Sequence, residues 1–533
     1  MENAHIADRL EAFAVLLDLA GASTFSTRAY RRAAELVRAT PAPVAELVRT
    51  GRVRELRGIG PGIERRLREL VETGEIAELA ELEAELSPEL VGLGRLIGVS
   101  AGRMAEIGRT LGIRTVAELR TAADEGRLAT VPGIGPKTEE RIRAGLREAG
   151  RRVPRRGLLL NRARALAGSI ADALGGEVAG DPRRWCDSSE RLAVVVRADD
   201  PEPVLDRLAE LPQLVAVVER EDDRAVGVTV EGVPVEVIAA PTERYGTELL
   251  RATGPWELVR ALEPLPEAAD EERVYAALGR PYLPPELRDL FDEPRPLVEL
   301  GHVRGDLHVH TTSSDGKASV LEMGEAARAR GYEYLAICDH TRNVRVVPGL
   351  DGDDVRRQSE EIAVANEALV PFRVLRGIEC DILPDGSLDL PDEVLAELEW
   401  VQISLHAGQR APREELTARV VEAMRHPAAR CLSHPTGRLI NHRPANALDL
   451  EQVLVVALET GVALEVNGLP DRLDLRDEHV RLAVEAGVPL VCSTDAHSVR
   501  GLGNMQLALG TARRGGAGPA DVLNTRPLQD FVT

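Results

Sequence analysis

Seven short apolar runs recur in the second half of the chain, and each is followed by a segment with helical periodicity. They are DLHV (306–309), YLAIC (334–338), VLRGI (374–378), VQISL (401–405), RCLS (430–433), VALEV (462–466) and VPLVCST (488–494). Their spacing of roughly 30 residues is that of one strand–helix unit, and continuous apolar runs are typical of strands that are buried on both faces. Seven such units predict a parallel barrel related to the TIM type, which binds ligands at the carboxyl ends of its strands.

Histidines and carboxylates stand at most of these strand ends. Ten of the 11 histidines follow residue 300, and six of the seven runs end in His, Glu or Asp. The candidate ligands are His308, His310, Asp315, His340, Glu379, His406, His434, Asp495 and His497. A single histidine in such a place is more often structural, but the strand ends of a barrel converge on one mouth. Nine nitrogen and oxygen ligands there are too many for one ion, and a set without thiolates suits zinc, manganese or iron.

The sequence therefore predicts two or three divalent metals bridged by a carboxylate. Clustered metals bind phosphate oxygens and activate water, so hydrolysis of a phosphoester is the chemistry that this pattern favours. Four cysteines lie near the candidate ligands, and we expect them to be small buried strand residues rather than ligands. These are Cys338, Cys380, Cys431 and Cys492.

The motifs DLHVHTTSSDG, ICDHT, GIECDI, ISLH, SHPTGR, EVNG and STDAH resemble those of the polymerase and histidinol phosphatase (PHP) family, over about residues 302–525. The resemblance implies a distorted (β/α)7 barrel with a trinuclear centre. It implies that His308, His310, Glu379 and Asp495 hold one metal, that Asp315, His340 and His497 hold a second, and that Glu379, His406 and His434 hold a third. We expect the catalytic residues to be His308, His310, Glu379, His406 and Asp495.

Two glycine-rich turns in the first 150 residues each follow one predicted helix and open another. They are LRGIGPGI (56–63) and VPGIGPKT (131–138), and they resemble helix-hairpin-helix motifs that bind DNA. Such glycines let the backbone turn tightly and aim N–H groups at a phosphate. The expected DNA contacts are Gly58, Gly60, Gly62, Gly133, Gly135, Lys137 and Thr138. Arginines are also dense in residues 141–164, where they would neutralise the DNA backbone without reading its sequence.

The order of these parts resembles bacterial family X DNA polymerases from end to end. In that family the region between the hairpins and the barrel is a palm that holds two metals on three aspartates. Here those positions are Arg191, Ala193 and Glu236, and one remaining carboxylate cannot hold two metals. If the alignment with the family is shifted, Asp187 or Glu190, which lie nearby, would instead occupy a metal-binding position of the palm.

The chain is predicted to be multidomain. We expect an all-α helix-hairpin-helix domain at 1–80, a helical fingers-like domain with the second hairpin at 81–155, and a degenerate α/β nucleotidyltransferase-like palm at 156–261. A Pro-rich linker at 262–300 and the PHP barrel at 301–533 follow. Five cysteines without a CxxC pair, the lack of a signal peptide and the lack of a long apolar run predict a cytoplasmic protein without membrane contact.

The leading functional hypothesis is a DNA-binding, metal-dependent phosphoesterase that uses manganese or zinc, with iron as an alternative. It would act as a 3′–5′ exonuclease or process abasic sites and 3′ ends in repair, on gapped or end-containing DNA of any sequence. The net charge of −21 argues against binding of nucleic acid over the whole surface, but it does not argue against a local basic surface that binds it. Three alternatives stay open: an active family X polymerase with an attached exonuclease, a phosphatase for small molecules such as histidinol phosphate, and an inert DNA-binding scaffold.

Overall fold

The fold is taken from a computed structural model of the full chain. It describes residues 1, 3–19, 24–40, 42–56, 58–85, 87, 90, 93–94, 99–147, 157–344 and 347–530. The described residues form two compact units. The N-terminal unit comprises those within Met1–Leu158, Arg162–Pro182 and Ser189–Gly279, and the C-terminal unit comprises Leu159–Asn161, Arg183–Ser188 and the residues from Arg280 onward.

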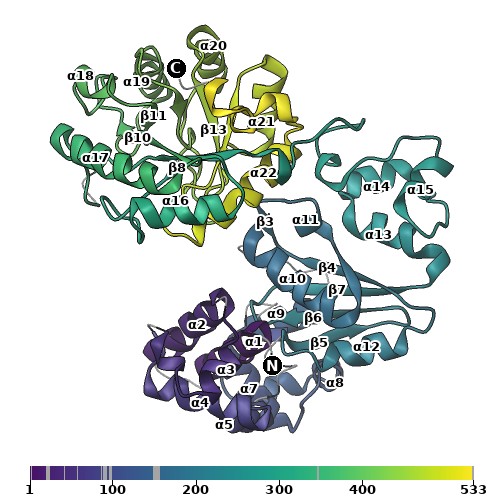
Figure 1. The fold of residues 1–533 in the computed structure, drawn as a ribbon. Coiled ribbons are helices and arrows are strands. Elements are labelled where there is room, and N and C mark those ends of the chain that lie inside the picture. The colour runs from purple at the N-terminus through teal and green to yellow at the C-terminus, as the bar shows by residue number, and fades with distance from the viewer. Residues whose placement is uncertain are drawn as a thin grey trace. The chain divides into compact units, whose positions relative to one another are not determined.

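Helices make up the first part of the N-terminal unit (Figure 1). They are α1 (Asn3–Leu19), α2 (Thr24–Ala39), α3 (Val44–Arg49), α4 (Pro61–Thr73), α5 (Ala77–Glu85), α7 (Ala101–Leu111), α8 (Val116–Asp124) and α9 (Pro136–Arg147). In α4 the buried residues Ile63, Leu67 and Leu70 recur at helical spacing, and the helix ends at Gly74, whose φ of 88° is left-handed. The helices around the first hairpin and those around the second form separate apolar cores.

A five-stranded sheet with the order β2-β4-β7-β6-β5 forms the rest of this unit. Its strands are β2 (Gly176–Ala179), β4 (Leu192–Arg197), β5 (Leu214–Arg220), β6 (Arg224–Thr229) and β7 (Pro234–Ala240). Side chains alternate between the faces: Val194 and Val196 pack with helices α10 (Leu160–Leu174) and α12 (Glu202–Ala209). Ala193 and Val195 pack with α13 (Tyr245–Thr253) on the other face. The mixed α/β region is thus present where the sequence predicts it.

The C-terminal unit contains a seven-stranded parallel sheet with the order β14-β13-β12-β11-β10-β9-β8. Its strands are β8 (Gly305–Val309), β9 (Tyr334–Ile337), β10 (Arg373–Asp381), β11 (Trp400–Ser404), β12 (Cys431–Leu432), β13 (Ala463–Asn467) and β14 (Leu490–Ser493). The backbone N–H of His310 donates to the carbonyl of Ala496 at 2.9 Å, which joins the first strand to the last. The seven predicted strands and the distorted, nearly closed barrel are confirmed.

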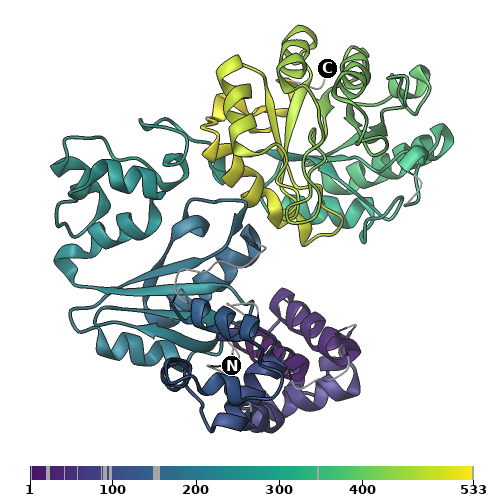
Figure 2. The ribbon, with the colours of Figure 1, turned by 180° about the vertical axis from the view of Figure 1, so that it is seen from behind.

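Helices surround this barrel, as Figures 1 and 2 show. They are α16 (Val320–Ala329), α17 (Gly352–Leu369), α18 (Asp392–Leu395), α19 (Arg413–Met424), α20 (Leu450–Thr460), α21 (Asp477–Ala486) and α22 (Met505–Arg514). One core lies between sheet and helices, and a second lies inside the barrel, where Leu307, Tyr334 and Trp400 pack together. The four cysteines near the candidate ligands are buried, as expected.

The predicted linker is more ordered than its prolines suggest. Residues 262–300 contain the helix α15 (Glu271–Ala277), which begins at the N-cap Asp270 and buries Val274 and Tyr275. The boundary between the two units falls just after this helix, between Gly279 and Arg280. The apolar positions of a seven-residue helix are too few to give a clear period, which is why the sequence pattern missed it.

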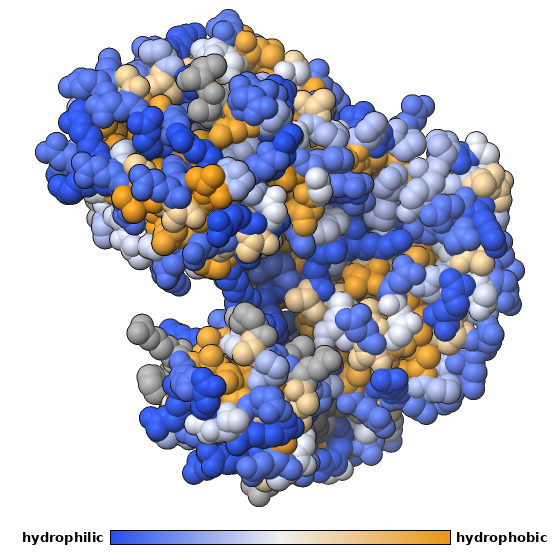
Figure 3. Space-filling view, in the orientation of Figure 1, coloured by the Kyte–Doolittle hydropathy of each residue, from blue (hydrophilic) through white to orange (hydrophobic). Residues whose placement is uncertain are grey.

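The surface is largely hydrophilic in the face that Figure 3 shows, with hydrophobic side chains scattered among polar ones. Exposed large apolar residues of the barrel include Val364 and Val370 near the end of α17 and Val455 on α20. Scattered apolar residues are normal on the surface of a folded protein. No helix in the described part of the chain has the length and apolar character needed to cross a bilayer.

Candidate metal centre

Each predicted ligand lies at or just beyond the carboxyl end of a barrel strand, or in the loop that follows it. His308 belongs to β8 and Glu379 to β10, and the others follow their strands directly or, for Asp315, in the β8–α16 loop. Glu379 is 1% exposed, and His308 and His310 are fully buried. These side chains are far too polar to be buried without a compensating partner.

Donor atoms of these residues come together in three groups whose members lie within 4.8 Å of one another. The first group is His308, His310 and Asp495; the second is His310, Asp315, His340 and His497; the third is His340, Glu379 and His406. Eight of the nine predicted ligands are therefore placed in at least one group among the described residues.

Glu379 lies at the centre of these groups. Its Oε2 is 2.9 Å from Nδ1 of His340 and 3.5 Å from Nε2 of His308. Its Oε1 is 2.9 Å from Nε2 of His434 and 3.5 Å from Nε2 of His406. The ninth ligand, His434, thus faces the same carboxylate, and the two oxygens face different sets of imidazoles. This is the arrangement that a bridging carboxylate requires.

The geometry differs from the partition that the family resemblance implies in two respects. His310 also faces the group of Asp315 and His497, and His340 also faces Glu379 together with His406. A histidine ring carries two nitrogens, so one ring can lie between two groups: Nδ1 of His340 approaches Glu379 while Nε2 lies 3.7 Å from Asp315. Which ligand holds which metal stays a prediction.

The residues fit a divalent metal cluster. Several buried side-chain atoms that could bind a metal have no hydrogen-bond partner among the described residues, although buried polar atoms almost always have one. They include Nδ1 of His310 and Nδ1 of His434. Imidazole and carboxylate donors without a thiolate suit manganese, zinc or iron.

A second set of buried polar residues holds the ligands in place. Glu465, on β13, accepts a hydrogen bond from Nδ1 of His308 at 2.6 Å and another from the backbone N–H of His434 at 2.6 Å. Its Oε1 also accepts from Nε2 of Gln402 at 2.8 Å. Partners of this kind fix the tautomer and orientation of a ligand histidine. Sequence reasoning missed Glu465, although a carboxylate within the apolar run VALEV was a usable signal.

Asp339 and Asp381 play a similar part. Asp339 accepts hydrogen bonds from the backbone N–H of Thr311 at 2.8 Å and from Gln358 at 2.6 Å. Asp381 lies 3.2 Å from Nδ1 of His406. These carboxylates bind the ligand-bearing loops to the barrel, so the geometry of the centre depends on more than its ligands.

Two of the predicted ligands have left-handed backbone conformations, which residues other than glycine rarely adopt. His434 has a φ of 25° and Asp495 a φ of 51°. Such conformations cost free energy and persist where surrounding contacts enforce them, which is common at functional sites.

The charges of the cluster shift the pKa values of its members. Burial raises the pKa of Glu379, but the imidazoles of His340, His406 and His308 outweigh it and hold that pKa well below its ordinary value. Burial lowers the pKa of His497, but the hydrogen bond to Asp315 and the charge of Asp495 raise it to about 9. For His310, burial and the neighbouring His340 lower the pKa to about 4.

These shifts predict that metal binding releases protons. A histidine must be neutral to bind a metal, and His497 with a pKa of about 9 carries a proton at neutral pH. Metal affinity at its group should therefore rise with pH, by up to about tenfold per pH unit, and level off above about 9. Calorimetric titration in buffers of different ionisation enthalpy measures the protons released. Equal release by His497→Ala and the unaltered protein would assign the proton to another group.

The predicted palm positions are not arranged as a metal site. Ala193 of β4 pairs with Glu236 of β7, so the structure places these two positions side by side. Ala193 is buried, and Glu236 lies 3.6 Å from Nη1 of Arg224. A guanidinium beside the remaining carboxylate opposes the binding of a cation.

The segment Arg183–Ser188, which lies between α11 (Gly180–Arg183) and β3 (Ser188–Ser189), packs with the barrel. Asp187 accepts a hydrogen bond from Nη1 of Arg438 at 2.8 Å. Arg184 donates to Asp289 at 3.0 Å. The alternative alignment that would use Asp187 as a palm ligand therefore meets a carboxylate already paired within the C-terminal unit.

Both glycine turns have the backbone that a hairpin motif needs. Gly58 and Gly133 have φ values of 113° and 80°, which favour glycine. Ile59 and Ile134 are buried and anchor the turns. A Cβ atom added at Gly60, Gly62, Gly133 or Gly135 would meet nothing within 4 Å, so their surroundings are open to a ligand. The turns lead directly into α4 and α9, whose first N–H groups have no partner within the helix.

The predicted arginine-rich surface is described only in part. Arg143 pairs with Glu139 at 2.8 Å, and Arg162 pairs with Glu231 and Glu11. The side chain of Arg147 and the residues Arg151, Arg152, Arg155 and Arg156 lie outside the described part of the chain. The positive charge of these two arginines is thus partly neutralised by neighbouring carboxylates.

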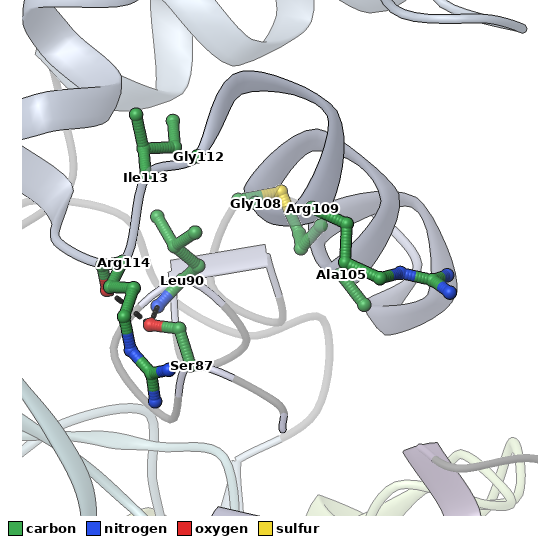
Figure 4. A pocket seen from close by; sticks show the side chains of 9 residues that line it. Ser87, Leu90, Ala105, Gly108, Arg109, Gly112, Ile113 and Arg114 are labelled. Carbon is green, nitrogen blue, oxygen red and sulfur yellow. Dashed lines mark hydrogen bonds between the residues drawn. The ribbon is translucent and has the colours of Figure 1, made fainter. Parts of the chain in front are cut away.

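A small pocket of about 250 Å³ lies beside α7 (Figure 4). Leu90, Met104 and Ile113 are among its lining residues, and the hydroxyl of Ser87 donates to the carbonyl of Arg114 at one side. The described lining holds no histidine, cysteine or carboxylate. This pocket therefore offers none of the metal-binding side chains that gather at the barrel mouth.

Comparison with known proteins agrees with these features. A model of the helix-hairpin-helix domain matches residues 1–76, and one of the SAM-like helix-hairpin-helix tandem matches residues 98–148. A "Probable phosphatase" of Acetivibrio thermocellus is 31% identical over 201 residues, 36% of this chain and 78% of its own length. A "Probable phosphatase" of a Thermoanaerobacter species is 27% identical over 41% of this chain and 89% of its own length.

One relative matches along the whole chain. The "DNA polymerase/3′-5′ exonuclease PolX" of Bacillus subtilis is 32% identical over 556 residues, which cover 98% of this chain and 97% of the relative. Identity over nearly the full length of both proteins places the hairpins, the palm-like sheet and the barrel in one shared architecture. The chain belongs to the family X DNA polymerase/3′–5′ exonucleases.

Proposed function

We propose that this protein is a DNA-bound, metal-dependent phosphodiesterase, acting as a 3′–5′ exonuclease or on abasic sites and 3′ ends in repair. The observation that carries the proposal is the set of nine candidate nitrogen and oxygen ligands at the barrel mouth, with Glu379 at its centre and only Asp315, His406 and His497 among the nine partly exposed. The name of the B. subtilis relative includes a 3′–5′ exonuclease, which supports this polarity. Two or three divalent metals, manganese or zinc, would bind at these ligands, and they supply charge that binds phosphate oxygens and activates water.

The residues of the chain divide the remaining work. Glu379 would hold the metals together, and His308, His310, His406 and Asp495 would complete the catalytic set. Glu465 orients His308 through the hydrogen bond to Nδ1. Hydrolysis joins a water oxygen to phosphorus and breaks the bond between phosphorus and the 3′ oxygen of the shortened strand. The products are a nucleoside 5′-monophosphate and a new 3′-hydroxyl.

The experiment that tests this proposal is incubation of the full chain with end-labelled gapped DNA and Mn²⁺. Stepwise shortening from the 3′ end supports the exonuclease. The same preparation is compared on a small phosphomonoester such as histidinol phosphate. Faster turnover of that ester than of DNA would identify a small-molecule phosphatase, and the absence of cleavage of both would identify an inert scaffold.

DNA is proposed to contact the two hairpins, and Gly60 offers a test that spares the fold. Gly60 is the N-cap of α4, and an added Cβ there meets nothing within 4 Å. Aspartate and asparagine are both favourable N-caps. Gly60→Asp should weaken DNA binding about tenfold, because it places a carboxylate beside the phosphate. Fluorescence anisotropy with labelled gapped DNA measures the Kd.

Gly60→Asn is the matched control, because it adds a side chain of the same size without the charge. Its Kd should stay within about threefold of the unaltered protein. Equal binding by the Asp and Asn variants would show that no phosphate lies at this turn.

A further inference from the structure

Helix α14 (Trp256–Leu262) of the N-terminal unit leaves most of its surface exposed. It lies beside α13 and α15 (Figure 1). Leu262 is the one buried residue of its seven, so the helix is anchored at its carboxyl end. A helix that buries so little contributes little to the core, and its other side chains are available for contact with a ligand.

The first residue of this helix, Trp256, is 63% exposed. Among the described residues it is the one aromatic side chain that belongs to the exposed large apolar residues. The chain has three tryptophans, and the other two are covered: Trp400 is 2% exposed, and the ring of Trp185 packs over Gly510. Leaving an indole ring in water forgoes the free energy that its burial would supply. Its exposure therefore indicates a surface that binds a partner.

Arg260 lies one helical turn after Trp256, and residues four apart share one face of a helix. Its guanidinium carbon is 5.6 Å from the centre of the indole ring, which is within the reach of a cation–π contact. The pair presents a flat aromatic ring with a planar cation beside it. Both kinds of group stack on nucleobases.

The charges of α14 favour contact with bases over contact with phosphates. Arg260 is its one basic residue, and Glu257 and Glu263 lie close to it in the sequence. Arg251, on the preceding helix, already pairs with Glu248 at 2.6 Å. A surface that binds the DNA backbone needs an excess of positive charge, which this helix lacks. A ring that binds by stacking needs none, and the base must be unpaired to offer its face.

The preceding helix holds α14 beside the palm-like sheet. Helix α13 packs on Ala193 of β4, one of the predicted palm positions. Gly254 joins the two helices: its N–H donates to the carbonyl of Leu250 at 2.8 Å, and an added Cβ would come within 2.9 Å of Val259. This tight connection gives the start of α14, and with it Trp256, a fixed position on the palm-like part of the chain.

We infer that Trp256, with Arg260 beside it, is a stacking platform for an unpaired base of single-stranded DNA. The inference rests on the proposed function in taking DNA as the ligand, but it concerns binding and not cleavage. Stacking is tolerant of sequence, because every base has a π face. The platform gives the palm-like domain a part in holding a single strand, such as a frayed 3′ end.

The test compares two single strands of about 12 nucleotides, one of deoxythymidine and one of abasic tetrahydrofuran units. Both carry phosphorothioate linkages, which resist hydrolysis, so the full chain is used with its metals. The strands have equal charge, and only one has bases. Anisotropy of a labelled strand gives the Kd of the unaltered protein, Trp256→Ala, Trp256→Phe and Leu300→Ala. Leu300, 45% exposed in the C-terminal unit, is the control for loss of an exposed apolar side chain.

Trp256→Ala should bind the thymidine strand about 5- to 100-fold more weakly, and the abasic strand within about twofold of the unaltered protein. Trp256→Phe should recover part of the loss, because phenylalanine keeps a smaller aromatic face. The slope of log Kd against log salt should be the same in Trp256→Ala, because no phosphate contact is removed. Leu300→Ala should bind both strands as the unaltered protein does.

Tryptophan emission gives a second readout, which a purely structural role of the ring would not change. The thymidine strand should quench the emission of the unaltered protein and shield it from acrylamide, because Trp256 is the exposed one of the three tryptophans. The abasic strand should do neither. Trp256→Ala should show no quenching with either strand.

Equal binding of the thymidine strand by Trp256→Ala and the unaltered protein would overturn the platform and leave α14 as a surface for a protein partner. Equal weakening with both strands would also overturn it, because the effect would not depend on bases. The proposed function fails differently. A protein that binds the thymidine strand through Trp256 but shortens no DNA keeps the platform and refutes that function. One that shortens DNA while Trp256→Ala binds normally keeps the function and refutes the platform.

Discussion

Replacing Glu379 by glutamine is expected to lower DNA cleavage about a thousandfold or more. The amide keeps the shape of the side chain but loses the charge that faces imidazoles on both sides, at 2.9 Å from His340 and 2.9 Å from His434. Losing one well-placed group that stabilises charge at a reaction centre costs about 10²–10³ in rate. As the proposed bridging ligand, Glu379 would serve more than one metal, so its loss should cost more. Single-turnover cleavage of labelled DNA, with metal content determined in parallel, measures the effect.

The control for this prediction is Glu361→Gln, which removes one carboxylate from an exposed position on α17. It should leave cleavage and metal content unchanged. His406→Ala is a second test at a ligand that is 16% exposed and so less critical for folding. Cleavage by either ligand variant at the rate of the unaltered protein would remove the barrel from the mechanism.

The second large effect concerns polymerisation: no primer extension is expected with Mn²⁺ and deoxynucleoside triphosphates. Nucleotidyl transfer needs two metals held by several carboxylates, and only Glu236 remains, next to Arg224. Gel analysis of a labelled primer on a gapped template measures extension.

This assay is best run in the Glu379→Gln variant, because an active exonuclease would remove added nucleotides before they are seen. A family X polymerase with intact palm aspartates serves as the positive control for template and nucleotides. Extension in this background would show that Arg191 and Ala193 do not occupy the metal-binding positions, and would make the active polymerase the better hypothesis.

Much of the barrel could be predicted because its signals are local. A buried parallel strand is a continuous apolar run, and the residue that ends it faces the mouth by topology alone. The strand ends at His308, Glu379 and His434 needed no knowledge of tertiary contacts. The hairpins were equally visible, since a left-handed turn at Gly58 and Gly133 demands glycine.

The assignment of the predicted ligands to the separate groups of donor atoms could not be predicted from their spacing in the sequence. It depends on which ring nitrogen of His310 and His340 faces which neighbour, and that is a matter of side-chain rotation in the packed site. Glu465 was missed because its role comes from two contacts across the barrel, to His308 and to the backbone of His434.

The segment Arg183–Ser188 has a consequence for how this protein can be divided. It lies within the palm-like part of the sequence, yet it completes the C-terminal unit. The ring of Trp185 fills the space above Gly510, where an added Cβ would come within 2.3 Å of it. Asp187 accepts a hydrogen bond from Arg438, which also donates to the backbone carbonyl of Arg472 in the loop after β13. A gene fragment that starts at Arg280 would encode every metal ligand but not these supports. The barrel is therefore not a self-contained module, because a segment of the palm-like sequence belongs to its packing.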